Sequence, residues 1–197
     1  MSKSDTITFR ICAFSTDSKY NVDSILSVFF NKVKCQNINS LREKNIEFDY
    51  RYSKSMNLHT NFVQVTNFSR SHNICSCADC ILLMVDVENK DNLDELKKIK
   101  DYVNSNCIYG KKVYILGLFN DKSKIVHNEK TIKSTFQTDF FSLDFRQICY
   151  QNSDEIINEI KQIYSDVLEG KDSMPVGEKD DDLTGEDVQS KSKCIVF

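Results

Sequence analysis

An uninterrupted apolar run in the middle of the chain constrains the fold more than any other feature. Residues 80–87 are apolar except for Asp86, and a run of this length without alternation is typical of a strand buried on both faces. Apolar residues then recur at helical spacing between Lys and Asp: Leu93, Leu96, Ile99 and Val103. A buried strand followed by an amphipathic helix is half of a βαβ unit, so we expect a largely parallel sheet covered by helices.

The composition limits the class of protein. The 197 residues, of which 40% are hydrophobic, suffice for one α/β domain and a tail. The net charge of -3 argues against a nucleic-acid binder, which usually carries a basic face. No apolar run approaches the ~20 residues of a membrane span, and the first residues lack a signal-peptide core. We therefore expect a cytosolic protein whose eight Cys are reduced thiols.

Strand and helix patterns alternate on both sides of the central unit. The expected strands are 6–14, 45–52, 61–66, 80–87, 112–118 and 140–145. The expected helices begin after Asn21, near Asn89 or Asp91, at Glu129 and after Asn152, whose capping box includes Glu155. Residues 36–44 and 67–76 read as polar connections. Six strands and about five helices thus predict an α/β domain over residues 1–168.

The last 29 residues have a different composition. Residues 169–197 hold three of the five Gly and the only Pro, and they contain too few large apolar residues to fold. We expect a disordered tail there. The chain ends in Cys194-Ile195-Val196-Phe197, which fits the C-a-a-X prenylation signal, with a terminal Phe favouring geranylgeranyl. Cys194 is therefore the expected lipidation site, and a single isoprenoid predicts reversible membrane association.

Parts of the chain resemble Ras-superfamily small GTPases, and Rab proteins most of all. Ala-Asp-Cys at 78–80 enters the apolar strand, Asp-Val-x-Asn-Lys-Asp follows it at 86–91, and the chain ends in a prenylation signal. The resemblance implies a Ras-like, P-loop-type fold. It has a mostly parallel six-stranded sheet with helices on both faces, an antiparallel strand pair before the central strand, and a phosphate-binding loop after the first strand.

This sequence lacks the residues of that family's phosphate-binding loop. The pattern G-x-x-x-x-G-K-[ST] cradles phosphate with backbone N–H groups, a Lys and a magnesium-binding hydroxyl. It falls on residues 16–23, where both Gly are absent. Val22 stands in place of the Lys, and Asp23 in place of the Ser or Thr. A carboxylate beside a triphosphate opposes binding.

The other nucleotide motifs are also reduced. The phosphate-sensing D-x-x-G falls on residues 65–70 and the S-A-K element on residues 144–146, and neither matches. The guanine-reading N-K-x-D falls on residues 118–121, where Asp121 alone remains. The connection at 67–76 is short, which predicts a truncated second switch.

Three residues are left as candidate nucleotide contacts, namely Ser18, Lys19 and Asp121. Lys19 could reach a phosphate, and Asp121 could pair with a guanine base. The alternatives are a solvated loop Lys and an Asp that stabilises a turn after a strand. We expect no catalytic residue, since no Ser/His/Asp or Cys/His arrangement stands out.

A cluster of Cys and His residues offers an alternative, metal-binding interpretation. Four potential zinc ligands lie within nine residues: His72, Cys75, Cys77 and Cys80. However, Cys80 opens the buried strand, where a Cys is an ordinary core residue, and C-x-C is not the usual zinc spacing. We therefore expect no metal site.

These patterns favour a Rab-like pseudo-GTPase that acts as a prenylated binding or scaffold protein in vesicle traffic or signalling. A divergent but active GTPase, which would bind GTP or GDP with Mg²⁺, is the first alternative, and a constitutive subunit of a larger complex is the second. No cofactor is expected otherwise. The expected partners are a membrane, a prenyltransferase, a prenyl-binding chaperone and a protein effector, with no nucleic acid. The expected location is the cytoplasmic face of an intracellular or plasma membrane, with a cytosolic pool.

Overall fold

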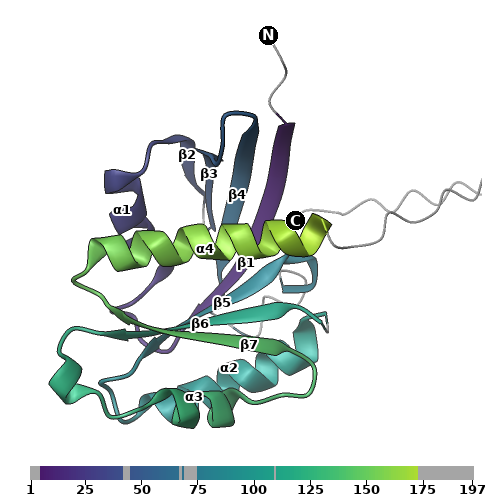
Figure 1. The fold of residues 1–197 in the computed structure, drawn as a ribbon. Helices are drawn as coiled ribbons and strands as arrows, with labels where there is room; N and C mark the ends of the chain where they lie inside the picture. The colour runs from purple at the N-terminus through teal and green to yellow at the C-terminus, as the bar shows by residue number, and fades with distance from the viewer. Residues whose placement is uncertain (1–4, 42–44, 67, 69–74, 109, 173–197) are drawn as a thin grey trace, which may run out of the picture.

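A seven-stranded sheet with helices on both faces forms the body of the protein (Figure 1). The computed structural model describes residues 5–41, 45–66, 68, 75–108 and 110–172. The strands are β1 Asp5–Ser15, β2 Cys35–Leu41, β3 Asn45–Arg51, β4 Met56–Gln64, β5 Cys80–Asp86, β6 Lys112–Phe119 and β7 Ser142–Cys149. The α-helices are α1 Val22–Lys32, α2 Asn92–Asn106, α3 Glu129–Phe136 and α4 Ser153–Asp172. Two 3₁₀ turns, η2 Cys75–Cys77 and η3 Lys122–Lys124, are also used below.

The strands lie in the order β2-β3-β4-β1-β5-β6-β7. The pairs from β4 through β1, β5 and β6 to β7 are all parallel. The pairs β2–β3 and β3–β4 are antiparallel. The expected α/β class and mostly parallel sheet are therefore confirmed, including the antiparallel pair that precedes the central strand.

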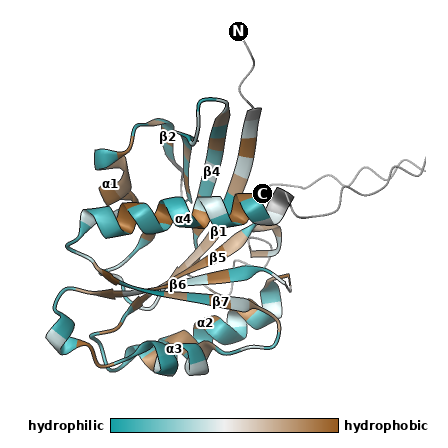
Figure 2. Cartoon of the chain, viewed as in Figure 1, coloured by the Kyte–Doolittle hydropathy of each residue, from teal (hydrophilic) through white to brown (hydrophobic). Residues whose placement is uncertain are grey.

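Two apolar layers sandwich the sheet. One layer packs α1 and α4 against the sheet, and the other packs α2 and α3 on the opposite face. Figure 2 shows largely apolar colouring on β1 and β5 in the middle of the sheet, and alternating polar and apolar bands along α4. Every residue of β5 is buried, with Leu82 in the first layer and Leu83 in the second. The prediction that this strand is covered on both faces is confirmed.

The structure corrects the number of strands. Residues 36–44 were expected to be a connection, but Cys35–Leu41 forms the edge strand β2, so the sheet has seven strands and not six. Backbone pairing with β3 carries this strand, because residues 36–39 leave their side chains exposed. The pairing shifts between Gln36 and Asn39, where Asn37 adopts a φ of 51°, a conformation that Asn tolerates better than most residues.

Other boundaries differ by a few residues. β4 begins at Met56, before the predicted start at residue 61, and β7 spans Ser142–Cys149 where 140–145 was predicted. Four α-helices lie within the described ranges, against about five expected. The helix α4 continues to Asp172, beyond the predicted domain end at residue 168. None of the described helices is both long and apolar enough to cross a bilayer.

The predicted caps position α1 and α4. Asn21 accepts a hydrogen bond from the Ser24 amide at 2.9 Å, and Asn152 accepts one from the Asp154 amide at 3.2 Å. These bonds satisfy amides that a helix start leaves without a partner. At α2, Asp91 occupies the cap position but makes no side-chain cap bond. The Asn21 cap therefore fixes the start of α1 at the loop that follows β1.

Candidate functional site

The candidate site lies where β1, β5 and β6 end. In open α/β sheets, ligands bind outside the carboxyl ends of the parallel strands, and the strand ends at Ser15, Asp86 and Phe119 meet at this edge. The loop at 16–21 connects β1 to α1, as a phosphate-binding loop would. This edge therefore holds the three residues predicted as nucleotide contacts.

The loop after β1 is closed by its own hydrogen bonds. The Ser15 hydroxyl contacts the carbonyl oxygen of Asp17 at 2.5 Å and that of Tyr20. The Asp17 amide donates to the Ser15 hydroxyl at 3.2 Å, and the Lys19 amide donates to Asp17 Oδ1 at 2.9 Å. The Tyr20 amide donates to the Asp17 carbonyl at 3.3 Å. These amides are consequently occupied by oxygens of the loop itself.

The backbone amides at the start of α1 also donate hydrogen bonds to acceptors within the protein. The Asn21 amide donates to Ser24 Oγ at 3.1 Å, which completes a capping box with the bond from Ser24 to Asn21. The Val22 amide donates to Oε1 of Gln64 at 3.2 Å, from the end of β4. Gln64 is buried. A phosphate at this helix start would have to displace these acceptors before it could use the amides.

Tyr20 fills the space beneath the loop. Its side chain is 0% exposed, and its ring lies 4.9 Å from that of Tyr150 at an angle of 58°. The side-chain amide of Asn120 donates to the Tyr20 hydroxyl at 2.9 Å. Burial raises the pKa of the Tyr20 phenol. The loop therefore rests on a packed aromatic side chain at the strand edge.

Lys19 is directed towards carboxylates of its own chain. Its Nζ lies 3.9 Å from Asp86 Oδ2, 3.8 Å from Glu88 Oε2 and 4.6 Å from the centre of the Tyr20 ring. A hydrogen bond with Tyr20 is the main cause that raises the pKa of Lys19. Burial is the main cause that raises the pKa of Asp86. The one cation that the sequence offered for a phosphate is thus surrounded by acidic groups.

Asp121 serves the turn in which it lies. Its Oδ1 accepts hydrogen bonds from the Ser123 amide at 3.0 Å and from the Ser123 hydroxyl at 2.7 Å, at the start of η3. These bonds hold the pKa of Asp121 below its usual value. The Asp121 amide donates to Glu88 Oε1 at 2.8 Å, so Glu88 connects Asp121 to Lys19. The Asp121 carboxylate therefore bonds to the turn at the start of η3.

The structure brings Lys19 and Asp121 to one edge, but it gives Ser18 a different role. Ser18 is exposed, and its carbonyl accepts a hydrogen bond from the Asn21 side chain at 3.1 Å. Cys194 lies outside the described residues. Sequence reasoning missed Tyr20, although a large aromatic residue inside an otherwise polar loop was a visible signal.

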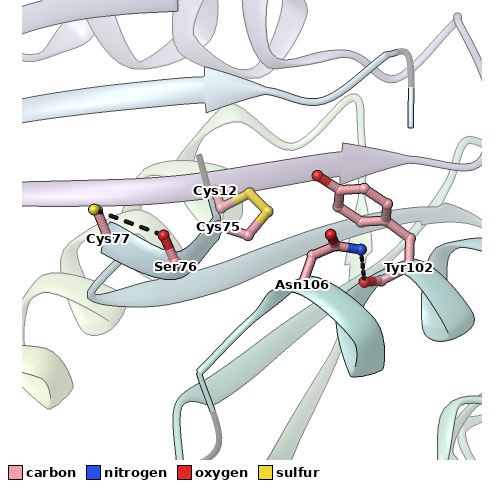
Figure 3. Close-up of a disulfide and its surroundings, with 6 residues drawn as sticks. All are labelled: Cys12, Cys75, Ser76, Cys77, Tyr102 and Asn106. Carbon is pink, nitrogen blue, oxygen red and sulfur yellow. Dashed lines mark hydrogen bonds between the residues drawn. A yellow bond between two sulfur atoms is a disulfide. The ribbon is translucent and has the colours of Figure 1, made fainter. Parts of the chain in front are cut away.

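The cysteines show one arrangement that contradicts the expectation of eight reduced thiols. Cys12 of β1 and Cys75 of η2 form a disulfide, 63 positions apart. In Figure 3, Ser76 lies between Cys77 and this bond, and the Cys77 sulfur contacts the Ser76 hydroxyl. Proximity in the fold explains the difference, because β1 and the turn before β5 become neighbours only in the assembled sheet.

The possible zinc ligands do not form a cluster in the part of the chain that the structure describes. Cys75 is in the disulfide, Cys77 is exposed and Cys80 is buried in β5. His72 falls outside the described residues. Within those residues, no group of three or more His, Cys, Asp or Glu is placed to hold a metal ion.

Comparison with known proteins adds no family assignment. Neither the models of protein families nor the curated proteins include a match to this chain. The resemblance to small GTPases therefore stays a prediction from the sequence.

Proposed function

We propose that the chain is a Rab-like pseudo-GTPase, a Ras-like domain that binds protein partners at a membrane without using nucleotide. Three features support a Ras-like domain: the strand, loop and helix from β1 to α1, the antiparallel β3–β4 pair, and the central strand β5 followed by α2. In this proposal β2 is an additional edge strand on that fold.

The single observation that carries the proposal is the self-satisfied loop after β1. Phosphate loops bind through amides that are available to the ligand, whereas the amides of Asp17, Lys19 and Tyr20 bond within the loop. The Val22 amide is bonded to β4. A nucleotide would have to break several of these bonds, each with a net worth of about 0.5–1.5 kcal/mol, before it gained any of its own.

Electrostatics add to this cost. A phosphate that reached Lys19 would lie beside Asp86 and Glu88, whose oxygens are within 4 Å of the ammonium. Two like charges about 4–5 Å apart repel by roughly 3–4 kcal/mol at an effective dielectric constant of ~20. Micromolar binding requires about -8 kcal/mol. A hydrogen bond from guanine to Asp121 could contribute only about 1.5–3 kcal/mol to the binding free energy.

The proposed anchor is a geranylgeranyl group on Cys194. In this proposal the chain that follows α4 carries the group to the cytoplasmic face of a membrane, after modification by a prenyltransferase and with a prenyl-binding chaperone maintaining a cytosolic pool. The partner is a protein effector or a larger assembly. Vesicle traffic is the role that the resemblance to Rab proteins supplies.

Calorimetry of the full-length protein with GTP and GDP, each with Mg²⁺, tests the proposal. We expect no binding tighter than about 10 μM and no hydrolysis. Asp121→Ala is the matched control, because it removes the one residue that fits the guanine-reading motif. A dissociation constant below about 10 μM that weakens in this variant would establish the alternative of an active GTPase.

A further inference from the structure

The disulfide between Cys12 and Cys75 joins the middle of the sheet to the turn that leads into β5. Cys12 lies in β1 and is 1% exposed, while Cys75 opens η2 and is 0% exposed. Both belong to the apolar layer on the α2 and α3 face. Both cysteines are therefore shielded from solvent in the folded protein.

Hydrogen bonds between β1 and the residue before β5 lie next to this bond. The Asp79 amide donates to the Arg10 carbonyl at 2.8 Å, and the Arg10 amide donates to Asp79 Oδ2 at 2.8 Å. The Ala78 amide reaches the Cys75 carbonyl at 3.4 Å. The two bonds between Arg10 and Asp79 report on whether this segment is seated on β1, and the Ala78 bond reports on whether the turn itself is intact.

A small hollow lies between β1 and β4 beside the disulfide. Its lining includes Cys12 itself, Arg10 on the same strand, Asn61 on β4, and Ala78 after η2. Figure 3 shows Tyr102 and Asn106 of α2 on the side of the disulfide opposite Cys77. Ala78, which directly follows η2, is the part of this lining that adjoins the turn.

We propose that the Cys12–Cys75 bond is a redox-sensitive clasp. In the oxidised state it holds η2 against β1, and reduction by a dithiol releases η2 and the adjoining Ala78 from β1. Disulfides in reducing compartments are usually transient and redox-sensing, which fits the cytosolic location expected from the sequence. No step in this proposal uses nucleotide or lipid, so its outcome is independent of the proposed function.

The exchange is balanced in electrons and protons. A thiolate of the reductant attacks one sulfur, the S–S bond breaks, and the departing Cys thiolate takes up a proton. The second thiol of the reductant then displaces the other Cys from the mixed disulfide. Two electrons and two protons pass to Cys12 and Cys75, and the dithiol leaves as a disulfide.

Differential alkylation of the full-length, unprenylated protein gives the first test, with dithiothreitol as the dithiol. Without reductant we expect six of the eight Cys to be labelled under denaturing conditions, with Cys12 and Cys75 protected. After reduction we expect all eight to be labelled. The exposed Cys77 is the internal reference, because native protein should label there in both states.

Hydrogen exchange gives the second test, because it follows the turn and not only the sulfurs. We expect the Ala78 and Asp79 amides to exchange at least about tenfold faster after reduction. Cys12→Ala should show the faster exchange with or without dithiothreitol, and Cys75→Ala replaces it if that variant does not fold. Cys107→Ala is the matched control, because it removes a buried thiol outside the disulfide and should keep the response.

Two results would overturn the proposal. Labelling of all eight Cys without reductant, in protein exposed to air, would show that the clasp does not form. Exchange at Ala78 and Asp79 that changes by less than about twofold on reduction would show that the bond forms without controlling the turn.

Discussion

Replacement of Tyr20 tests whether the loop after β1 is held by packing. The Tyr20 side chain is 0% exposed, lies 4.9 Å from the Tyr150 ring and accepts a hydrogen bond from Asn120. Truncation of a buried aromatic residue to Ala costs about 3–5 kcal/mol, because contacts are lost and a cavity remains. Tyr20→Phe keeps the ring and loses only the hydroxyl with its hydrogen bonds, for which we expect about 1–2 kcal/mol.

The neighbouring Lys19 supplies the control for this comparison. Its side chain is 47% exposed, and exposed ion pairs contribute at most about 1 kcal/mol, so Lys19→Ala should change the free energy of unfolding little. Urea denaturation of the three variants, followed by circular dichroism, measures all of these values. A loss of unfolding free energy below about 1 kcal/mol in Tyr20→Ala would show that the ring is not packed. The conclusion that the protein fills this site with its own side chain would then be wrong.

Three further predictions concern other parts of the chain. Gly117→Ala should cost about 1–3 kcal/mol by overpacking, because the added Cβ would lie 2.7 Å from Phe145 Cζ; urea denaturation should show part of this loss recovered in a double variant with Phe145→Leu. Cys12→Ala should lower the stability of the oxidised protein by about 4 kcal/mol, the loop-closure value for two residues 63 positions apart, but much less under dithiothreitol, and an equal loss in both conditions would contradict the disulfide. Cys194→Ser should move the protein from the membrane to the soluble fraction on sedimentation of cell extracts, and unchanged membrane fractionation would refute the lipid anchor.

Local sequence patterns were sufficient where burial followed a regular period. The apolar run at 80–87 predicted β5 because a strand covered on both faces has no polar side, and the helix predicted to begin at Glu129 is α3, Glu129–Phe136. The Asn caps of α1 and α4 were found because a cap depends on residues only a few positions away. These elements form the sheet edge at which the candidate site lies.

Two strands show why the rest was harder to predict. The side chains at 36–39 in β2 are exposed, so this strand has no apolar alternation, and its hydrogen bonds to β3 leave no mark in the sequence. In β4, the buried residues Leu58, Thr60 and Phe62 alternate with less buried neighbours, but the predicted strand began only at residue 61.

The features that define the candidate site depend on contacts between distant positions. Tyr20 meets Asn120 across 100 positions of sequence, and Cys12 meets Cys75 across 63. Motif comparison could show that the phosphate loop had lost its Gly and Lys residues. It could not show that a Tyr ring and carboxylates occupy the same edge, because that requires the assembled sheet.

The nucleotide content of the protein purified from the cells that make it tests the central claim most directly. The protein would be isolated with Mg²⁺ present throughout and then denatured, and the released nucleotides would be separated by ion-pair chromatography and counted per chain. Because the loop amides bond to the chain itself and Lys19 lies beside Asp86 and Glu88, we expect neither GDP nor GTP above background. One molecule of guanine nucleotide per protein chain would contradict the account.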